Sequence, residues 1–279
     1  MRQLVLANWF LFVVVSVAAA APPDVCTFKI ATMPDFCQTD KEGKFYDNGK
    51  NFCGPTAVCN SFVWLADHGF PNLLDKTGGL KNGQIALIQL LANEEQMDTV
   101  SKDGTGSRNL MIGIKRYVES KGYEPSRLEC QGWRPVAKPF SSEQSTVSLD
   151  WLREGIADPC GSAWINIGWY QRGDEKDTWT RKGGHWMTIA GYGVKENGDN
   201  DPAAFVAYDP APRSGKGNVA HYFHLEEIQS GKLTGEEKGL PRDAAGNYKI
   251  IDGIVPKKGM DAVIIDSAVV LILKKPAEK

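Results

Sequence analysis

The sequence is poor in histidine, in clustered positive charge and in long apolar runs. Its 279 residues include only 4 histidines, and basic residues never run beyond pairs such as Lys257-Lys258. Because binding to a phosphate backbone needs concentrated lysine and arginine, we expect no nucleic acid partner. No C-x-x-C pair occurs, which argues against a zinc site in a chain with so little histidine. We therefore expect no metal and no organic cofactor.

The one long apolar run lies at the start of the chain. Met1–Gln3 is basic, Leu4–Ala21 is almost wholly apolar, and small residues precede Pro22-Pro23. This pattern is typical of a secretory signal peptide, which we place at residues 1–20. The mature chain is then secreted or periplasmic, with no membrane contact after cleavage. The alternative is an uncleaved anchor, for which the run is marginal because a span needs roughly 20 apolar residues.

The remaining chain, residues 21–279, has the composition of one large globular domain. It is 42% hydrophobic and 24% charged over the whole sequence, which is ordinary for a folded domain. Apolar residues recur at helical spacing in four segments, at 55–67, 84–97, 106–121 and 148–157. Segments rich in β-branched and aromatic residues follow at 162–170, 185–194, 203–208, 219–225 and 260–273. We expect residues 125–145 to be an extended linker or a short strand.

This order predicts an α+β fold in two lobes. A helical lobe over about 33–158 would pack against an antiparallel β lobe over about 159–275. A cleft between two such lobes is a common place for an active site.

Cys53 stands at the expected start of the first helix. Gly54-Pro55 marks a turn and a first helical position, where the missing N–H of proline costs nothing. Apolar residues then recur over 58–65 on one helical face. A thiol at a helix entrance feels the positive end of the helix dipole, which favours the nucleophilic thiolate. Cys53 is therefore a candidate catalytic nucleophile.

Cysteine content leaves the state of this thiol open. The mature chain holds six cysteines, and export permits disulfides: Cys26, Cys37, Cys53, Cys59, Cys130 and Cys160. If Cys53 stays free, at most two bridges form and one further thiol is left over. The alternative is three bridges and no nucleophile, and sequence alone does not assign the connectivity.

A thiol nucleophile needs a base, and His185 is the best placed histidine. It follows paired glycines at 183–184, which would let another backbone or a substrate approach closely. His68 lies about four helical turns from the thiol, too far to reach it. His221 and His224 are three apart on an expected strand and so face opposite sides. The alternative for His185 is a satisfied core histidine.

Asp209 is the candidate that would orient the imidazole. If the hairpin between 185–194 and 203–208 is centred on Asn197, the numbers of paired residues sum to 394. His185 then lies directly opposite Asp209, with Cβ atoms roughly 5 Å apart. A slip of one residue would place the two side chains on opposite faces of the sheet.

Acyl chemistry also needs hydrogen-bond donors for an oxyanion. The backbone N–H of Cys53 would be one donor, and a side-chain amide from the preceding loop would be a second. Gln38 is our candidate, with Asn48 and Asn51 as alternatives. Gln38 lies fifteen residues before Cys53, so a loop has to bring it back to the thiol.

Together these segments resemble papain-superfamily cysteine peptidases, in particular the cysteine-peptidase family 39-like group, relatives of the bacteriocin leader-processing peptidases. The resemblance spans most of residues 33–212 and rests on four short segments: Met33-Pro34-Asp35-Phe36-Cys37-Gln38, Cys53-Gly54-Pro55-Thr56-Ala57, Gly184-His185-Trp186 and Tyr208-Asp209-Pro210. It implies a papain-like fold with Cys53 as nucleophile, His185 as base, Asp209 as orienter and Gln38 in the oxyanion site. The separation of Gln38 from Cys53 is longer than is usual in the superfamily. Nothing resembles the transporter to which leader-processing members are fused, so bacteriocin maturation is not implied.

We therefore expect a secreted papain-like thiol hydrolase that cleaves peptide or amide bonds of a peptide or protein substrate. One alternative is an acyl or peptidyl transferase that uses the same triad, with an amine in place of water. Another is a non-catalytic binding or surface protein of the same fold, with Cys53 bridged to Cys37 or Cys59. The sequence predicts no particular oligomeric state.

Overall fold

The structure, a computed structural model, describes residues 21–134, 136, 138–173, 175, 177–212, 219–235 and 241–275. The expected signal peptide at residues 1–20 lies outside the described residues. Within those ranges, no helix combines the length and the apolar character needed to cross a bilayer.

Helices and strands follow one another as the α+β prediction requires. The described helices are α1 (Cys53–Asp67), α2 (Leu80–Ala92), α3 (Ser107–Ser120) and α4 (Leu149–Ala157), with short 3-10 helices η1 (Lys41–Gly43), η2 (Tyr46–Gly49) and η3 (Pro71–Leu73). The described strands are β1 (Pro125–Gly132), β2 (Gly161–Arg172), β3 (Thr178–Val194), β4 (Asn200–Tyr208), β5 (Ala220–Glu227), β6 (Lys232–Thr234), β7 (Arg242–Asp243), β8 (Tyr248–Ile250) and β9 (Ala262–Leu273). The α+β class is confirmed.

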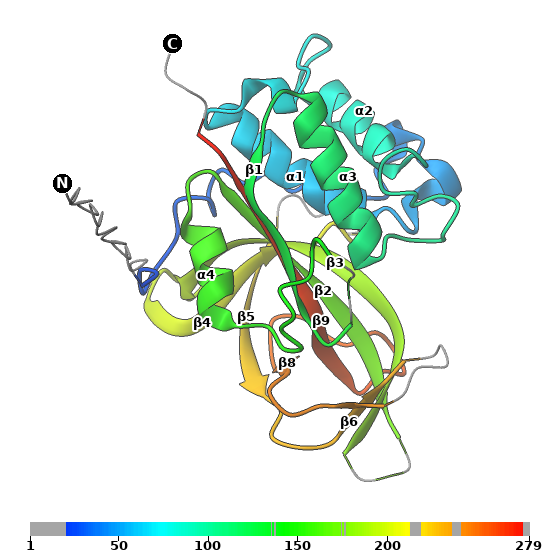
Figure 1. Cartoon of the computed structure of the whole chain (residues 1–279), viewed down its shortest axis with the longest axis vertical. Coiled ribbons are helices and arrows are strands. Elements are labelled where there is room, and N and C mark those ends of the chain that lie inside the picture. Colours follow the sequence, from blue (N-terminus) through cyan, green and yellow to red (C-terminus); the bar gives the residue numbers. More distant parts are fainter. Residues whose placement is uncertain are drawn as a thin grey trace, which may run out of the picture.

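Six of the strands close into a barrel. β2 pairs with β3, and the ring continues through β4, β5, β8 and β9, which pairs again with β2. Apolar side chains of these strands, such as Ile165, Ile189 and Phe223, form one core cluster. In Figure 1, α1, α2 and α3 gather at one end of the molecule, and α4 lies beside the barrel.

Helix α1 is the central element of the helical part. The residues of the expected apolar face over 58–65 are buried, and so is every other residue from Gly54 to Ala66. The helix contacts β3 on one side and α2 and α3 on others, and a helix covered on all sides needs no solvent-facing stripe. One of its polar residues bonds to a distant segment: the Asn60 side-chain oxygen accepts from the Phe36 N–H at 3.0 Å.

Several boundaries differ from those expected. α2 runs over Leu80–Ala92 rather than 84–97, because the Asn93 side chain accepts from the Gln96 N–H and turns the chain there. Residues 125–132 form β1, which pairs with β9, so the first half of the chain contributes a strand to the sheet. The short strands β6, β7 and β8 carry two or three residues each, too few for a periodic signal.

Residues that follow the expected signal peptide belong to the folded body. Cys26 exchanges two backbone hydrogen bonds of 3.0 Å with Tyr192 in β3. The Lys29 side chain is buried, and its Nζ donates to the carbonyls of Asp158 at 2.9 Å and Gly161 at 2.8 Å. Burial lowers the pKa of Lys29 to about 8. The segment therefore joins β3 to the end of α4.

His224 on β5 lies between two carboxylates on neighbouring segments. Its Nδ1 is 2.7 Å from Asp252 Oδ2, and its Nε2 is 3.0 Å from Asp201 Oδ2. The hydrogen bonds to Asp252 and then to Asp201 raise the pKa of His224 above its ordinary value of 6.5. The imidazolium therefore links β4, β5 and the loop before β9.

We expect His224→Asn to lower stability more at about pH 5.5 than at about pH 9.5, since a raised folded-state pKa gives stability below the unfolded pKa that is lost as pH rises. Urea unfolding at both pH values measures the difference. Lys249→Met, which breaks an exposed pair with Glu226 at 3.2 Å, is the control, and its effect should not depend on pH. An equal loss at both pH values for His224→Asn would contradict an ionic role.

Candidate active site

Cys53 is the first residue of α1, and its thiol is free and half-buried. The helix N-cap, Phe52, makes no side-chain capping bond, and the first turn contains no acidic residue. The first N–H groups therefore stay available, and nothing cancels the positive end of the helix dipole. This is the electrostatic setting that the sequence predicted for the thiol.

Two side chains of the sheet fix the position of α1 against the strand that carries His185. Trp164 Nε1 donates to the carbonyl of Ala57 at 3.1 Å, and Thr188 Oγ1 donates to the same oxygen at 2.8 Å. Ala57 is one helical turn from the thiol, and Thr188 is three residues from His185. The two bonds therefore hold Cys53 and His185 in a common frame.

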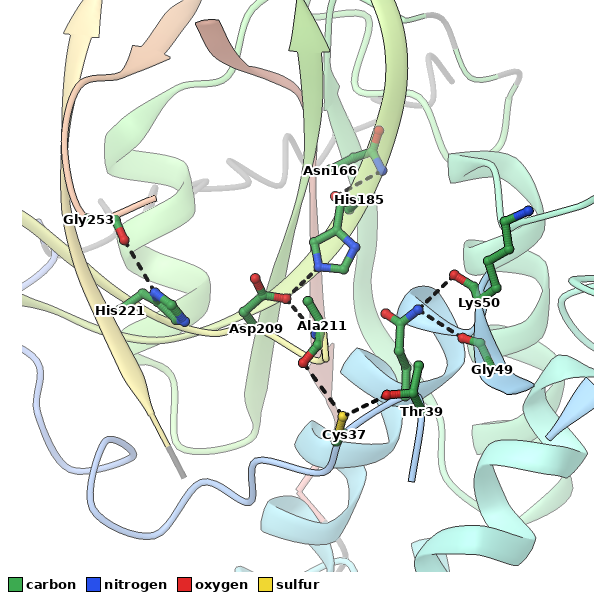
Figure 2. A network of polar contacts seen from close by, with 11 residues as sticks. Cys37, Thr39, Gly49, Lys50, Asn166, His185, Asp209, Ala211, His221 and Gly253 are labelled. Carbon is green, nitrogen blue, oxygen red and sulfur yellow. Dashed lines mark hydrogen bonds and ion pairs between the residues drawn. The ribbon is translucent and has the colours of Figure 1, made fainter. Parts of the chain in front are cut away.

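His185 contacts Asp209 through its ring. Nε2 lies 2.5 Å from Asp209 Oδ1, which also accepts from the Ala211 N–H at 2.8 Å (Figure 2). A carboxylate only accepts, so Nε2 carries a proton and Nδ1 remains for the thiol. The His185 side chain is 8% exposed and that of Asp209 is 18% exposed, so water screens the pair weakly.

The strand register that led to this pair is wrong in detail. The sum of 394 holds at the hairpin end, where Gly193 pairs with Asp201. Two irregularities then shift the register, and Thr188 pairs with Tyr208, a sum of 396. A shift by two residues keeps each side chain on its face, so Asp209 reaches His185 diagonally rather than from directly opposite.

The pKa values of Cys53 and His185 move in opposite directions. Burial acts against both charged forms. For Cys53, the hydrogen bond and charge of His185 and the N–H groups of Trp186 and Gly54 outweigh burial and lower the pKa of the thiol. For His185, Asp209 and the thiolate raise the pKa of the imidazole above its ordinary 6.5. The arrangement therefore favours a thiolate–imidazolium pair.

Gln38 lies in the loop that packs against the segment after Asp209. Its backbone N–H donates to the Pro210 carbonyl at 2.8 Å. Its Nε2 donates to the carbonyls of Gly49 and Lys50, both at 2.8 Å, while Oε1 is buried with no partner among the described residues. Both amide hydrogens are thus engaged by the loop that leads to Cys53 (Figure 2).

This loop has an unusual backbone. Asp47, Asn48 and Gly49 are consecutive residues with positive φ, of 45°, 52° and 76°. Gly49 has no alternative there, because a Cβ would lie 1.8 Å from the Gln38 carbonyl oxygen. Of the alternative donors, Asn48 is exposed and Asn51 is half-buried, whereas Gln38 is 4% exposed.

Sequence reasoning set aside or missed several neighbours of the site. His221 does not reach the thiol, and its Nδ1 faces the Gly253 carbonyl at 3.3 Å. Burial raises the pKa of Asp209, but the charge and hydrogen bond of His185 lower it overall, and the charge of His221 adds to this lowering. Asn166 of β2 lies 3.4 Å from the His185 carbonyl. No local sequence pattern marks either residue as a neighbour of the site, because each lies there through the pairing of strands that are distant in sequence.

The site brings together a thiol, an imidazole and a carboxylate, which are side chains used in nucleophilic chemistry. Among the described residues, no group of three or more histidine, cysteine or acidic side chains is arranged to hold a metal ion. A thiolate, an imidazolium and free helix N–H groups can form and hydrolyse a thioester. No protein-family model matches the chain, and no curated protein matches it either.

We expect iodoacetamide to alkylate Cys53 rapidly at pH values well below the ordinary thiol pKa of 9.0, because its own pKa is lowered. In His185→Ala, burial raises the pKa of the Cys53 thiol without the opposing charge of the imidazole. The pH midpoint of alkylation at Cys53 should therefore move upward. Peptide mapping across pH measures both. Half-buried Cys160, whose pKa is raised mainly by burial, is the internal reference; equal profiles for the two cysteines would contradict the ion pair.

Proposed function

We propose that the chain is a papain-like thiol hydrolase that cleaves peptide or amide bonds with Cys53, His185 and Asp209. The contact of His185 with both the Cys53 thiol and the Asp209 carboxylate carries this proposal. The free state of Cys53 also favours it over the binding-protein alternative, which requires a bridge at that thiol. We further propose that residues 1–20 direct export.

In the proposed reaction, the Cys53 thiolate attacks the substrate carbonyl carbon and an oxyanion forms. The His185 imidazolium gives its Nδ1 proton to the leaving amine, the C–N bond breaks, and a thioester remains. Water then attacks the thioester while His185 takes up its proton. The C–S bond breaks, and the carboxylic acid and free enzyme are released.

Asp209 orients the imidazole and stabilises its charge throughout. Its bond to Nε2 leaves Nδ1 directed to the thiol, which is the tautomer the proposal needs. The second bond to Oδ1, from the Ala211 N–H, fixes the carboxylate itself.

The oxyanion would be held by the Cys53 N–H at the helix entrance and by Gln38. Because both amide hydrogens of Gln38 are on the Gly49 and Lys50 carbonyls, one of these bonds has to be released as the oxyanion forms. One N–H of the Gln38 amide thus leaves a loop carbonyl and donates to the oxyanion instead. The exchange is favourable because a charged acceptor binds an N–H more strongly than a neutral one.

We expect Gln38→Ala to lower kcat for peptide hydrolysis by about 10²- to 10³-fold, the usual cost of one oxyanion donor. Iodoacetamide alkylation of Cys53 forms no oxyanion, so its rate should change by less than about twofold. Gln89→Ala is the matched control, since the Gln89 amide donates to the Gly43 carbonyl of the same loop at 2.9 Å. A parallel loss of alkylation in Gln38→Ala would point to a misplaced thiol instead.

We expect the mature chain to release free carboxylic acid from peptides, with loss of all turnover in Cys53→Ala. Mass spectrometry of the products with and without glycinamide measures the partition between water and amine. Predominant condensation with glycinamide would favour the acyl-transferase alternative. No Cys53-dependent product of either kind would contradict the enzyme.

A further inference from the structure

Arg181 lies beside the proposed catalytic residues but takes no part in the triad. Its Nη2 occupies the space of the absent side chain of Gly184, where a Cβ would lie only 1.9 Å away. Gly184 immediately precedes His185. Gly184 therefore admits a guanidinium of the same chain.

The guanidinium lies on the face of β3 that carries the Trp186 side chain and is turned toward the entrance of α1. Alternate residues of a strand share a face, so Gly184 and Trp186 point the same way, about 7 Å apart. The Trp186 backbone N–H helps to lower the pKa of the Cys53 thiol, and its indole Nε1 donates to the Thr105 carbonyl at 2.7 Å. Thr105 in turn packs on Gly54. Arg181 is thus continuous with the surroundings of the thiol.

A buried carboxylate holds Arg181 by one edge. Asp266, fully buried in β9, accepts from Arg181 Nε and also from Tyr170 Oη at 2.5 Å and Trp133 Nε1 at 3.1 Å. An ionised side chain in the middle of an apolar strand is expensive unless it is well bonded. These donors fix its position, and it fixes that of the guanidinium.

The opposite edge of Arg181 is open. Nη2 is 3.5 Å from Asn166 Oδ1, at the limit of a hydrogen bond. The Asn166 amide is better satisfied when turned over, with Nδ2 donating to Asp266 and Oδ1 accepting from Trp186 Nε1, both at 3.2 Å. None of the described residues is recorded as accepting from Nη1, and the side chain is 16% exposed.

We propose that Arg181 is a specificity residue that binds a substrate carboxylate close to the scissile amide. A guanidinium held at one edge presents the Nη1 and Nη2 donors as a fork that matches a carboxylate in two bonds. The preferred substrates are then peptides with an acidic side chain or a free carboxyl end near the cleavage point. The inference rests on the proposed function and names its substrate class.

The test uses pairs of quenched fluorescent Ala/Gly peptides that differ only by Glu or Gln at one of three positions on either side of the scissile bond. At one or more positions, we expect the ratio of kcat/KM for Glu over Gln to be about tenfold or more, as for a charge-assisted bond. Arg181→Met should bring this ratio close to one. Arg181→Lys should keep part of it, because it retains charge without the fork.

Arg172→Met is the matched control, since Arg172 stacks on Trp179 at 5.1 Å on the neighbouring strand and should keep the wild-type ratio. Because Arg181→Met leaves Asp266 without its cation, the double variant Arg181→Met/Asp266→Asn is measured as well. Each ratio is taken within one preparation, so a smaller folded fraction does not alter it.

A binding measurement separates this inference from the proposed function. Fluorescence anisotropy of the same Glu and Gln peptides with Cys53→Ala protein needs no turnover. Tighter binding of a Glu peptide that is lost in Cys53→Ala/Arg181→Met supports the carboxylate site even if no peptide is hydrolysed. Equal binding of the pairs, no binding at millimolar peptide, or a preference that survives Arg181→Met overturns it.

Discussion

The carbonyl oxygen of Ala57 is the point on which the geometry of the site depends. It accepts hydrogen bonds from Trp164 on β2 and Thr188 on β3, so the helix that begins at Cys53 and the strand that carries His185 cannot slide independently. Both donors are buried, and losing a buried partner costs more than such a bond contributes net. The thiol and the imidazole therefore keep their separation without any direct covalent tie.

Around this joint, each site residue is held by a segment distant in sequence. The Pro210 carbonyl accepts a hydrogen bond from the backbone N–H of Gln38. The preceding residue, Asp209, contacts His185. In the loop over 44–50, the carbonyls of Gly49 and Lys50 accept hydrogen bonds from the Gln38 side-chain amide. Three stretches of chain thus meet where the chemistry is proposed, and Asp266 holds Arg181 on the neighbouring part of the sheet.

The sequence predicted the class of the fold and the elements that carry the site, because helix-entrance chemistry and strand composition are local. It did not predict that α1 is buried on all sides, since that depends on what packs around it. The pairing of His185 with Asp209 was expected from a register that the bulges displaced by two residues. Because the shift is by an even number of residues, each side chain stays on the expected face of the sheet. The sequence analysis did not single out Asp266, whose partners lie on β2, β3 and the segment after β1.

The closed ring of strands has a consequence for the order of folding. β9 covers Ala262–Leu273 and is the last of the described strands, yet it pairs with β1, β2 and β8. Until those residues leave the ribosome, β2 has an unpaired edge, and the barrel cannot close. Such long-range pairings make folding slow. The barrel can therefore close only after most of the chain has been synthesised.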